Sequence, residues 1–246
     1  MIARFVLLEA LRGGLPWLGL ACVGAGVGLS AFLAQVALTE TREIQAAAAA
    51  GLLRASGAFL MMSHVIASVA REASERGLEL ALTLPISRST YYAGKLAGFS
   101  CCALLLASAF AAPLLLWSPP TPLAFWWASL ATEMALVAAM ALFFSMMLTA
   151  VVPAIAATAA LYLLGRSLST IEAIAAGPFA EEESTLRGLV DSLAILIPRL
   201  DAATRTEWLL YGLSTPSDPI AAVAGLAIYC ALASAAGLFD FSRRDL

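Results

Sequence analysis

The stretch 123-LAFWWASLATEMALVAAMALFFSMMLTAVVPAIAATAALYLLG-165 runs for 43 residues with a single charged side chain, Glu133. A helix that crosses a membrane needs roughly 20 such residues, so this stretch is too long for one span and suits two in succession. Residues from Thr149 to Pro153 favour a turn between them. We therefore expect two membrane-spanning helices, over about 123–148 and 151–168, with Glu133 at membrane depth.

The rest of the chain has the same character. Hydrophobic residues make up 61% of the 246 residues and charged residues 13%, whereas soluble domains have roughly 45–50% and about 25%. Four more apolar stretches are long enough to cross, and they lie near 15–38, 52–71, 95–117 and 219–240. The sequence thus predicts an all-α integral membrane protein with six transmembrane helices in a single domain, 1–246, with little room for a separate soluble domain.

The span near 52–71 is the least regular of the six. Only 16 uncharged residues separate Arg54 from Arg71, so we expect both arginines to extend outward to the membrane surface. After the next span, the run 118-SPPTP-122 favours a tight turn. Three tryptophans fit an aromatic belt at the membrane surface: Trp117, Trp126 and Trp127.

Two further segments are amphipathic. The N-terminal residues place Phe5, Leu8 and Leu11 on one side of a helix, which is typical of a helix lying in the membrane interface. The region 169–218 contains leucine and branched residues at helical spacing from 186 to 200. We expect an external amphipathic helix there, which either gates a path or merely caps the bundle.

Lysine and arginine are distributed unequally between the two sides. Six spans place both termini on one side, and eight basic residues flank the spans there: Arg4, Arg12, Arg71, Arg76, Arg88, Lys95, Arg243 and Arg244. The opposite side has six, of which four lie in or border the long region 166–218 and only Arg42 and Arg54 flank its short loop. The positive-inside rule therefore predicts cytoplasmic termini.

The charged insert 71-REASERGLELALTLPISRSTYYAGK-95 lies on that same side. We expect a short polar helix over about 72–84, which ends at Pro85, and a cap for the next helix from the hydroxyls of 87–90. Taken alone, this pattern also fits an ordinary solvated loop helix.

The insert resembles the segment between the second and third spans of ABC-2 type transporter permeases, through its runs 71–72, 75–82, 84–88 and 94–98. In that family the segment is the cytoplasmic coupling helix that docks into an ATP-binding subunit. The resemblance implies that the following residues contact the ATPase: Glu72, Glu75, Arg76, Glu79 and Leu82. The six-span plan and the N-terminal interfacial helix match the family's layout as well.

The resemblance implies an exporter subunit in a bacterial cytoplasmic (inner) membrane. Two permease copies, identical or related, would pair with two ATPase subunits that bind ATP and Mg²⁺, in contact with membrane lipid and with a periplasmic partner as a further option. The sequence itself has no Walker A pattern, since Gly94-Lys95 is followed by Leu96. We expect a non-catalytic subunit without its own cofactor and, at a net charge of −3, without a nucleic-acid partner.

Two other sites have open interpretations. Glu133 either lines the transport path or binds a neighbouring helix as a structural contact. His64 with Met61 suggests soft-metal binding, although such residues more often pack in a core, and we predict no metal. The pairs Gly24/Gly28 and 94/98 have the spacing of close helix contacts.

Two other classes of function remain as alternatives. The first is a membrane-embedded enzyme or assembly factor, for which Glu133 and the distant His64 form a sparse polar set. The second is a passive channel, which needs no docking helix. The sequence does not identify the substrate.

Overall fold

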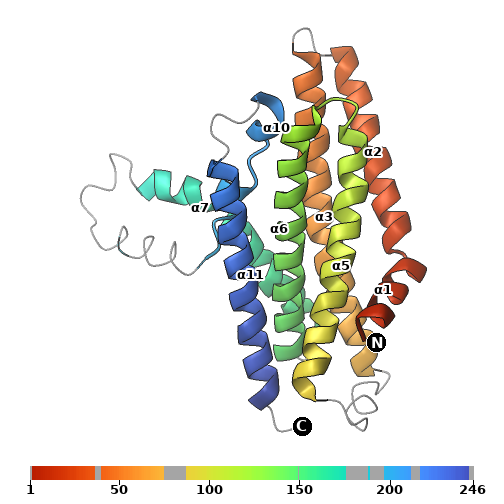
Figure 1. The fold of residues 1–246 in the computed structure, drawn as a ribbon, viewed down its shortest axis with the longest axis vertical. Coiled ribbons are helices and arrows are strands. Elements are labelled where there is room, and N and C mark those ends of the chain that lie inside the picture. Colours follow the sequence, from red (N-terminus) through yellow and green to blue (C-terminus); the bar gives the residue numbers. More distant parts are fainter. Residues whose placement is uncertain are drawn as a thin grey trace.

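The computed structural model describes residues 2–36, 40–74, 87–148, 150–175, 188, 197–211 and 217–243. Within these ranges every regular element is a helix (Figure 1). Six of the helices are long and apolar enough to cross a membrane, and they are α2 (Leu15–Val36), α3 (Thr41–Ser74), α5 (Arg88–Leu114), α6 (Pro120–Met147), α7 (Val151–Ala175) and α11 (Ser217–Arg243). The predicted all-helical architecture with six apolar helices is confirmed at this level.

The six helices alternate in direction, so both chain ends lie at the same end of the bundle, which we call the termini end (Figure 1). Helix α6 occupies the centre, where it packs against α3, α5, α7 and α11. Its side chains Trp126, Leu130 and Met134 are fully buried. The core of the molecule is therefore built around α6, the helix that the long apolar stretch encodes.

Helix α3 is longer than the predicted span of 52–71, because it begins at Thr41 and ends at Ser74. Its early turns contain the alanines 46–50, of which Ala46, Ala49 and Ala50 are buried. Alanine favours the helix, and its small side chain allows close packing against α2. Ser30 Oγ donates to the carbonyl of Gln45 at 2.9 Å, and Gln45 Nε2 donates back to the Ser30 carbonyl at 3.0 Å.

The turn between α5 and α6 follows the proline-rich run. Pro119 precedes α6 in an extended conformation, and Pro120 occupies the first helical position, where the missing N–H is not needed. The tryptophans of this region do not all behave as predicted. Trp126 is fully buried rather than part of a surface belt, because α6 is the central helix of the bundle.

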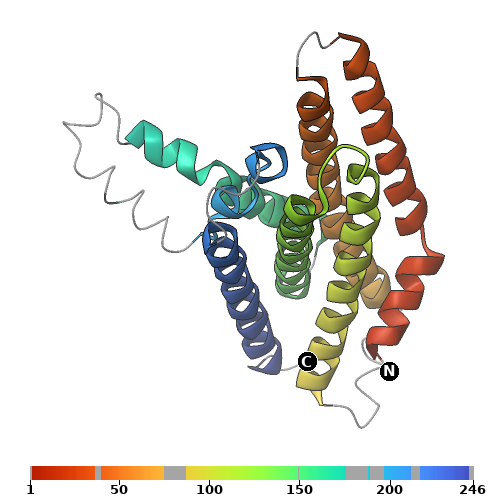
Figure 2. The ribbon, with the colours of Figure 1, turned by 45° about the horizontal axis from the view of Figure 1, so that its top comes forward.

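Helix α1 (Ile2–Arg12) lies beside the start of α5 at the termini end (Figure 2). Val6 and Ala10 are buried, whereas Phe5 is 69% exposed and Leu11 52% exposed. The apolar side chains that face away from the bundle fit a helix at a membrane interface.

Beyond the midpoint of α7, the chain leaves the main bundle (Figure 2). The described residues there form the end of α7 and two short helices, α9 (Leu200–Ala203) and α10 (Glu207–Tyr211). Most of the expected external amphipathic helix, from 186 to 196, lies outside the described residues.

Candidate functional site

Glu72 lies in the last turns of α3 and is bonded to the start of α5. Its Oε1 accepts a hydrogen bond from the hydroxyl of Tyr91 at 2.5 Å, and its Oε2 forms an ion pair with the ammonium of Lys95. Lys95 is only 3% exposed, so its charge needs this partner. The C-terminal end of α3 also carries the negative end of the helix dipole, which repels the carboxylate of Glu72. The ion pair with Lys95 compensates for this repulsion.

A second polar contact joins α1 to the same end of α3. Glu9 accepts a hydrogen bond from Arg71 at 2.9 Å through one carboxylate oxygen and from Ser68 at 3.0 Å through the other. Each oxygen of the carboxylate therefore accepts one hydrogen bond from α3, and these contacts tie α1 to the end of α3.

Helix α11 joins this arrangement through aromatic rings. Phe241 is stacked on Tyr91 with centroids 6.0 Å apart, and it lies 6.3 Å from the ring of Tyr92. These distances are within the range of favourable aromatic pairs. We call the following residues the anchor cluster: Glu9, Ser68, Arg71, Glu72, Tyr91, Lys95 and Phe241. The anchor cluster connects α1, α3, α5 and α11 at the termini end.

The helix that follows 75–86 starts as predicted. The hydroxyl of Ser87 accepts a hydrogen bond from the backbone N–H of Thr90 at 3.2 Å, which caps α5.

Of the residues expected to contact an ATPase, the described residues include only Glu72. It is half-buried in α3 and faces α5 instead of belonging to an exposed helix. Glu75, Arg76, Glu79 and Leu82 lie outside the described residues, as does most of the expected 72–84 helix.

A second group of charges is buried in the middle of the bundle. Nη1 of Arg54 lies 2.5 Å from Oε2 of Glu133, and its Nη2 donates to Ser129 at 3.0 Å. The other oxygen of Glu133 accepts from the hydroxyl of Tyr162 at 2.9 Å and lies 3.9 Å from Nη1 of Arg166. We call these five residues the core network; it joins α3, α6 and α7.

The core network corrects the prediction for Arg54. The side chain does not extend outward to the membrane surface, because it is 1% exposed and lies 5.2 Å from the ring centre of Trp126. Helix α3 continues beyond it to Thr41, so Arg54 is inside the bundle rather than at its edge. Glu133 is fully buried, as membrane depth requires, and its partner is an arginine. The only sequence feature that pointed to a buried Arg54 is the short uncharged run after it, which is too short for a complete span.

Three polar contacts on successive turns of α7 hold α9 in place. Arg166 donates to the hydroxyl of Thr204, and the backbone N–H of Ser169 donates to Asp201 at 3.0 Å. One turn further, Glu172 forms an ion pair with Arg199, the residue before α9. The core network is thereby linked to the end of the molecule opposite the termini.

His64 and Met61 both lie on α3. Met61 is completely buried, and the ring of His64 meets Phe99 edge-on at 6.0 Å. Among the described residues, no group of three His, Cys, Asp or Glu side chains is placed to hold a metal ion. Nε2 of His64 is buried without a hydrogen-bond partner among the described residues.

The sequence matches no protein-family model and no curated protein. The six long apolar helices among the described residues indicate the class of a multi-pass membrane protein.

Proposed function

We propose that this chain is the membrane subunit of an ABC-2 type exporter, which moves a substrate across a bacterial cytoplasmic membrane with ATP hydrolysed by separate ATPase subunits. The observation that carries the proposal is the anchor cluster, because it ties α3 and α5, the helices on either side of the segment 75–86, to each other and α3 to α1. The resemblance of this segment to a coupling helix supplies the partner.

The anchor cluster fits the transmission of force. A partner that pushes on 75–86 moves Ser74 and Ser87, and the ion pair of Glu72 with Lys95 makes α3 and α5 respond together. The contacts of Glu9 with Arg71 and Ser68 carry α1 along with them. A free loop helix without such ties would absorb the same displacement by bending.

The core network fits the same mechanism, because it can pass a movement of α3 to other helices. It binds α3 to the central helix α6 and to α7 through Glu133, so that a shift of α3 is passed on to both. A carboxylate with no exposed surface does not reach a substrate in this conformation. We therefore propose that Glu133 connects helices, and we give it no substrate contact.

The charge distribution supports cytoplasmic termini. With Arg54 inside the bundle, the short loop before α3 retains only Arg42 among its flanking basic residues. The termini end keeps Arg4, Arg12, Arg71 and Arg88 beside its helix ends. The bias toward the termini end is thus larger than the sequence alone indicated.

A second permease copy has apolar surface to bind. Of the six long helices, α2, α7 and α11 are the least buried within the chain. Gly24 and Gly28 on α2 have no atom of another residue near the position of a Cβ, and this opens α2 to close approach by lipid or by a second copy. We propose a dimer, of identical or related chains, with two ATPases.

Co-purification tests the proposed function. The tagged full chain, extracted in mild detergent, is expected to retain a protein with a Walker A motif, identified by mass spectrometry. Reversing two charges in the segment, Glu75→Lys with Glu79→Lys, is expected to release it, since a docking surface with like charges is repelled. Reversal of Glu40, on the opposite side, serves as the matched control. Retention that survives the double reversal would contradict the assigned contact.

A further inference from the structure

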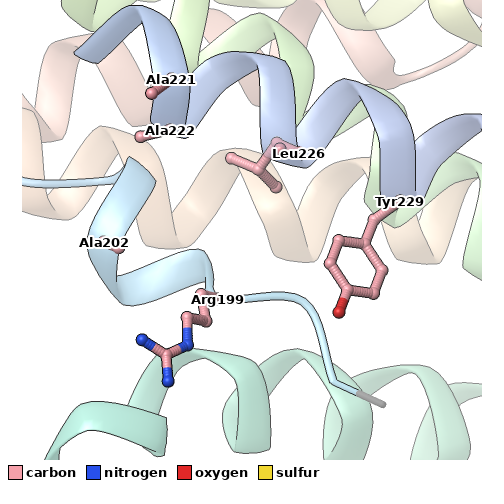
Figure 3. Close-up of a pocket in the computed structure, with 7 residues that line it drawn as sticks. Arg199, Ala202, Ala221, Ala222, Leu226 and Tyr229 are labelled. Atoms are coloured by element: carbon pink, nitrogen blue, oxygen red, sulfur yellow. The ribbon is translucent and has the colours of Figure 1, made fainter. Parts of the chain in front are cut away.

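A cavity of about 370 Å³ lies between α9 and the first half of α11 (Figure 3). This volume is within the range of small-molecule sites. Two polar side chains line it, Arg199 and Tyr229. The other lining residues are small or apolar: Ala202, Ala221, Ala222, Gly225 and Leu226.

Arg199 brings a guanidinium to the edge of the cavity, where its charge is paired with Glu172. Arg199 precedes α9, and Figure 3 shows its side chain and that of Tyr229 extending from opposite walls toward α7. Nη2 of Arg199 donates to Oε1 of Glu172 at 2.5 Å, and the Arg199 side chain is 56% exposed. A guanidinium has five N–H donors in a planar fork, so the contact with Glu172 leaves donors for an anion.

The body of the cavity is apolar because the face of α11 that lines it carries apolar residues. Its large side chains Ile228 and Leu232 point away from the bundle and are 61% and 59% exposed. The face toward α9 has Ala221, Ala222 and Gly225 instead. Leu226 is buried on this face, and the small side chains beside it leave space between α11 and α9.

We propose that this cavity binds an amphiphilic anion, a molecule with one carboxylate or phosphate head and an apolar body. The head lies on Arg199, and the body lies along the small residues of α11. This inference rests on the proposed function, for which it names the substrate class. The start of α11 is directed toward the end opposite the termini (Figure 1), so the cavity lies in the outer half of the bundle in the proposed orientation.

Glycine 225 offers a way to fill the cavity without disturbing the fold. A Cβ at Gly225, which lines the cavity, meets no neighbouring atom within 4 Å, so Gly225→Phe is the variant chosen to fill the space. Gly28 on α2 has the same open surroundings far from the cavity, and Gly28→Phe is therefore the matched control. Arg199→Gln removes the charge, and Glu172→Gln removes the competitor for it.

The test uses a photoreactive sixteen-carbon fatty acid, its methyl ester and a lysophosphatidic acid with the same photoreactive chain. The full chain is placed in phosphatidylcholine nanodiscs, and labelling of the peptides from 199 to 229 is measured by mass spectrometry. We expect an acid to label about tenfold more than the ester, and Arg199→Gln to remove that difference, as for one charge-assisted contact. The ratio of carboxylate to phosphate labelling identifies the head.

The variants separate a built site from lipid at the surface. Gly225→Phe is expected to abolish labelling by the acids, Gly28→Phe to leave it unchanged, and Glu172→Gln to raise it. Equal labelling by acid and ester, or full labelling of Gly225→Phe, would overturn the proposal. The measurement needs no ATPase, so a failure here leaves the co-purification result intact, and the reverse also holds.

Discussion

At the scale of single residues, the ion pair of Arg54 with Glu133 is the feature with the largest expected effect on stability. The side chains are 1% and 0% exposed, and the two charged atoms are 2.5 Å apart. Removing one partner of such a pair costs about 3–5 kcal/mol, because the remaining charge is left without compensation in the interior. Arg166, 3.9 Å from Glu133, adds to that cost.

We therefore predict that Glu133→Gln destabilises the protein by about 3–5 kcal/mol, measured as the free energy of unfolding by SDS in detergent micelles. Replacing both partners, Arg54→Met with Glu133→Leu, is expected to recover part of the loss, since the apolar pair needs no compensation while Tyr162 and Arg166 still lose their acceptor. Arg42→Gln, at an exposed position of the same helix, is the control. A double variant as unstable as the single one would contradict this account of the core network.

The pairing of Arg54 illustrates what the sequence could not provide. The uncharged run from 55 to 70 is short for a span, and the sequence therefore predicts that both arginines extend outward. In the structure, α3 extends to Thr41 and spans the required length, and the side chain of Arg54 points toward α6. The direction in which a side chain points depends on how α3 and α6 are rotated against each other, and no local pattern encodes that rotation.

At the scale of helices, α1 is seated on α5 by two glycines. A Cβ at Gly98 would lie 2.7 Å from Cβ of Val6 and 3.1 Å from the carbonyl oxygen of Ala3. A Cβ at Gly94 would lie 2.9 Å from Cβ of Ile2. The spacing of these glycines was recognised as that of a close helix contact, and the contact proves to be within the chain.

Gly98→Ala is expected to lower stability by about 1–3 kcal/mol, the usual cost of overpacking, and to loosen α1. Hydrogen exchange of the backbone amides from 2 to 12 measures the second effect and should become faster. Gly24→Ala meets no neighbouring atom and is the control. Unchanged exchange in Gly98→Ala would contradict the proposed seat of α1.

Within the anchor cluster, Glu72 is expected to connect α3 with α5 and not to bind the proposed ATPase. Because Glu72 faces Tyr91 and Lys95, we expect Glu72→Gln to leave the ATPase bound while weakening the connection of α3 to α5. Co-purification measures the first effect, and faster exchange of the amides from 88 to 95 measures the second. Release of the ATPase by Glu72→Gln would return this residue to the docking surface that the resemblance implies.

At the scale of the whole molecule, the apolar runs predicted six long helices because the length that crosses a membrane is fixed. Local signals with a direct physical cause were also reliable, such as the cap at Ser87 and the proline turn before α6. The early start of α3 follows the alanine run 46–50, which favours helix, whereas the end of α7 lies beyond any apolar run. Helix formation there is supported by packing and polar contacts that only the folded bundle provides.

The orientation of the bundle is the central claim, because an ATPase can reach the segment 75–86 only from the cytoplasm. A variant with the four native cysteines replaced by serine carries one new cysteine, at Glu79 or at Arg42. Each is treated with a membrane-impermeant maleimide in intact bacterial spheroplasts and again after permeabilisation. We predict that Glu79→Cys reacts only after permeabilisation and Arg42→Cys before it. Labelling of Glu79→Cys in intact spheroplasts would contradict the account.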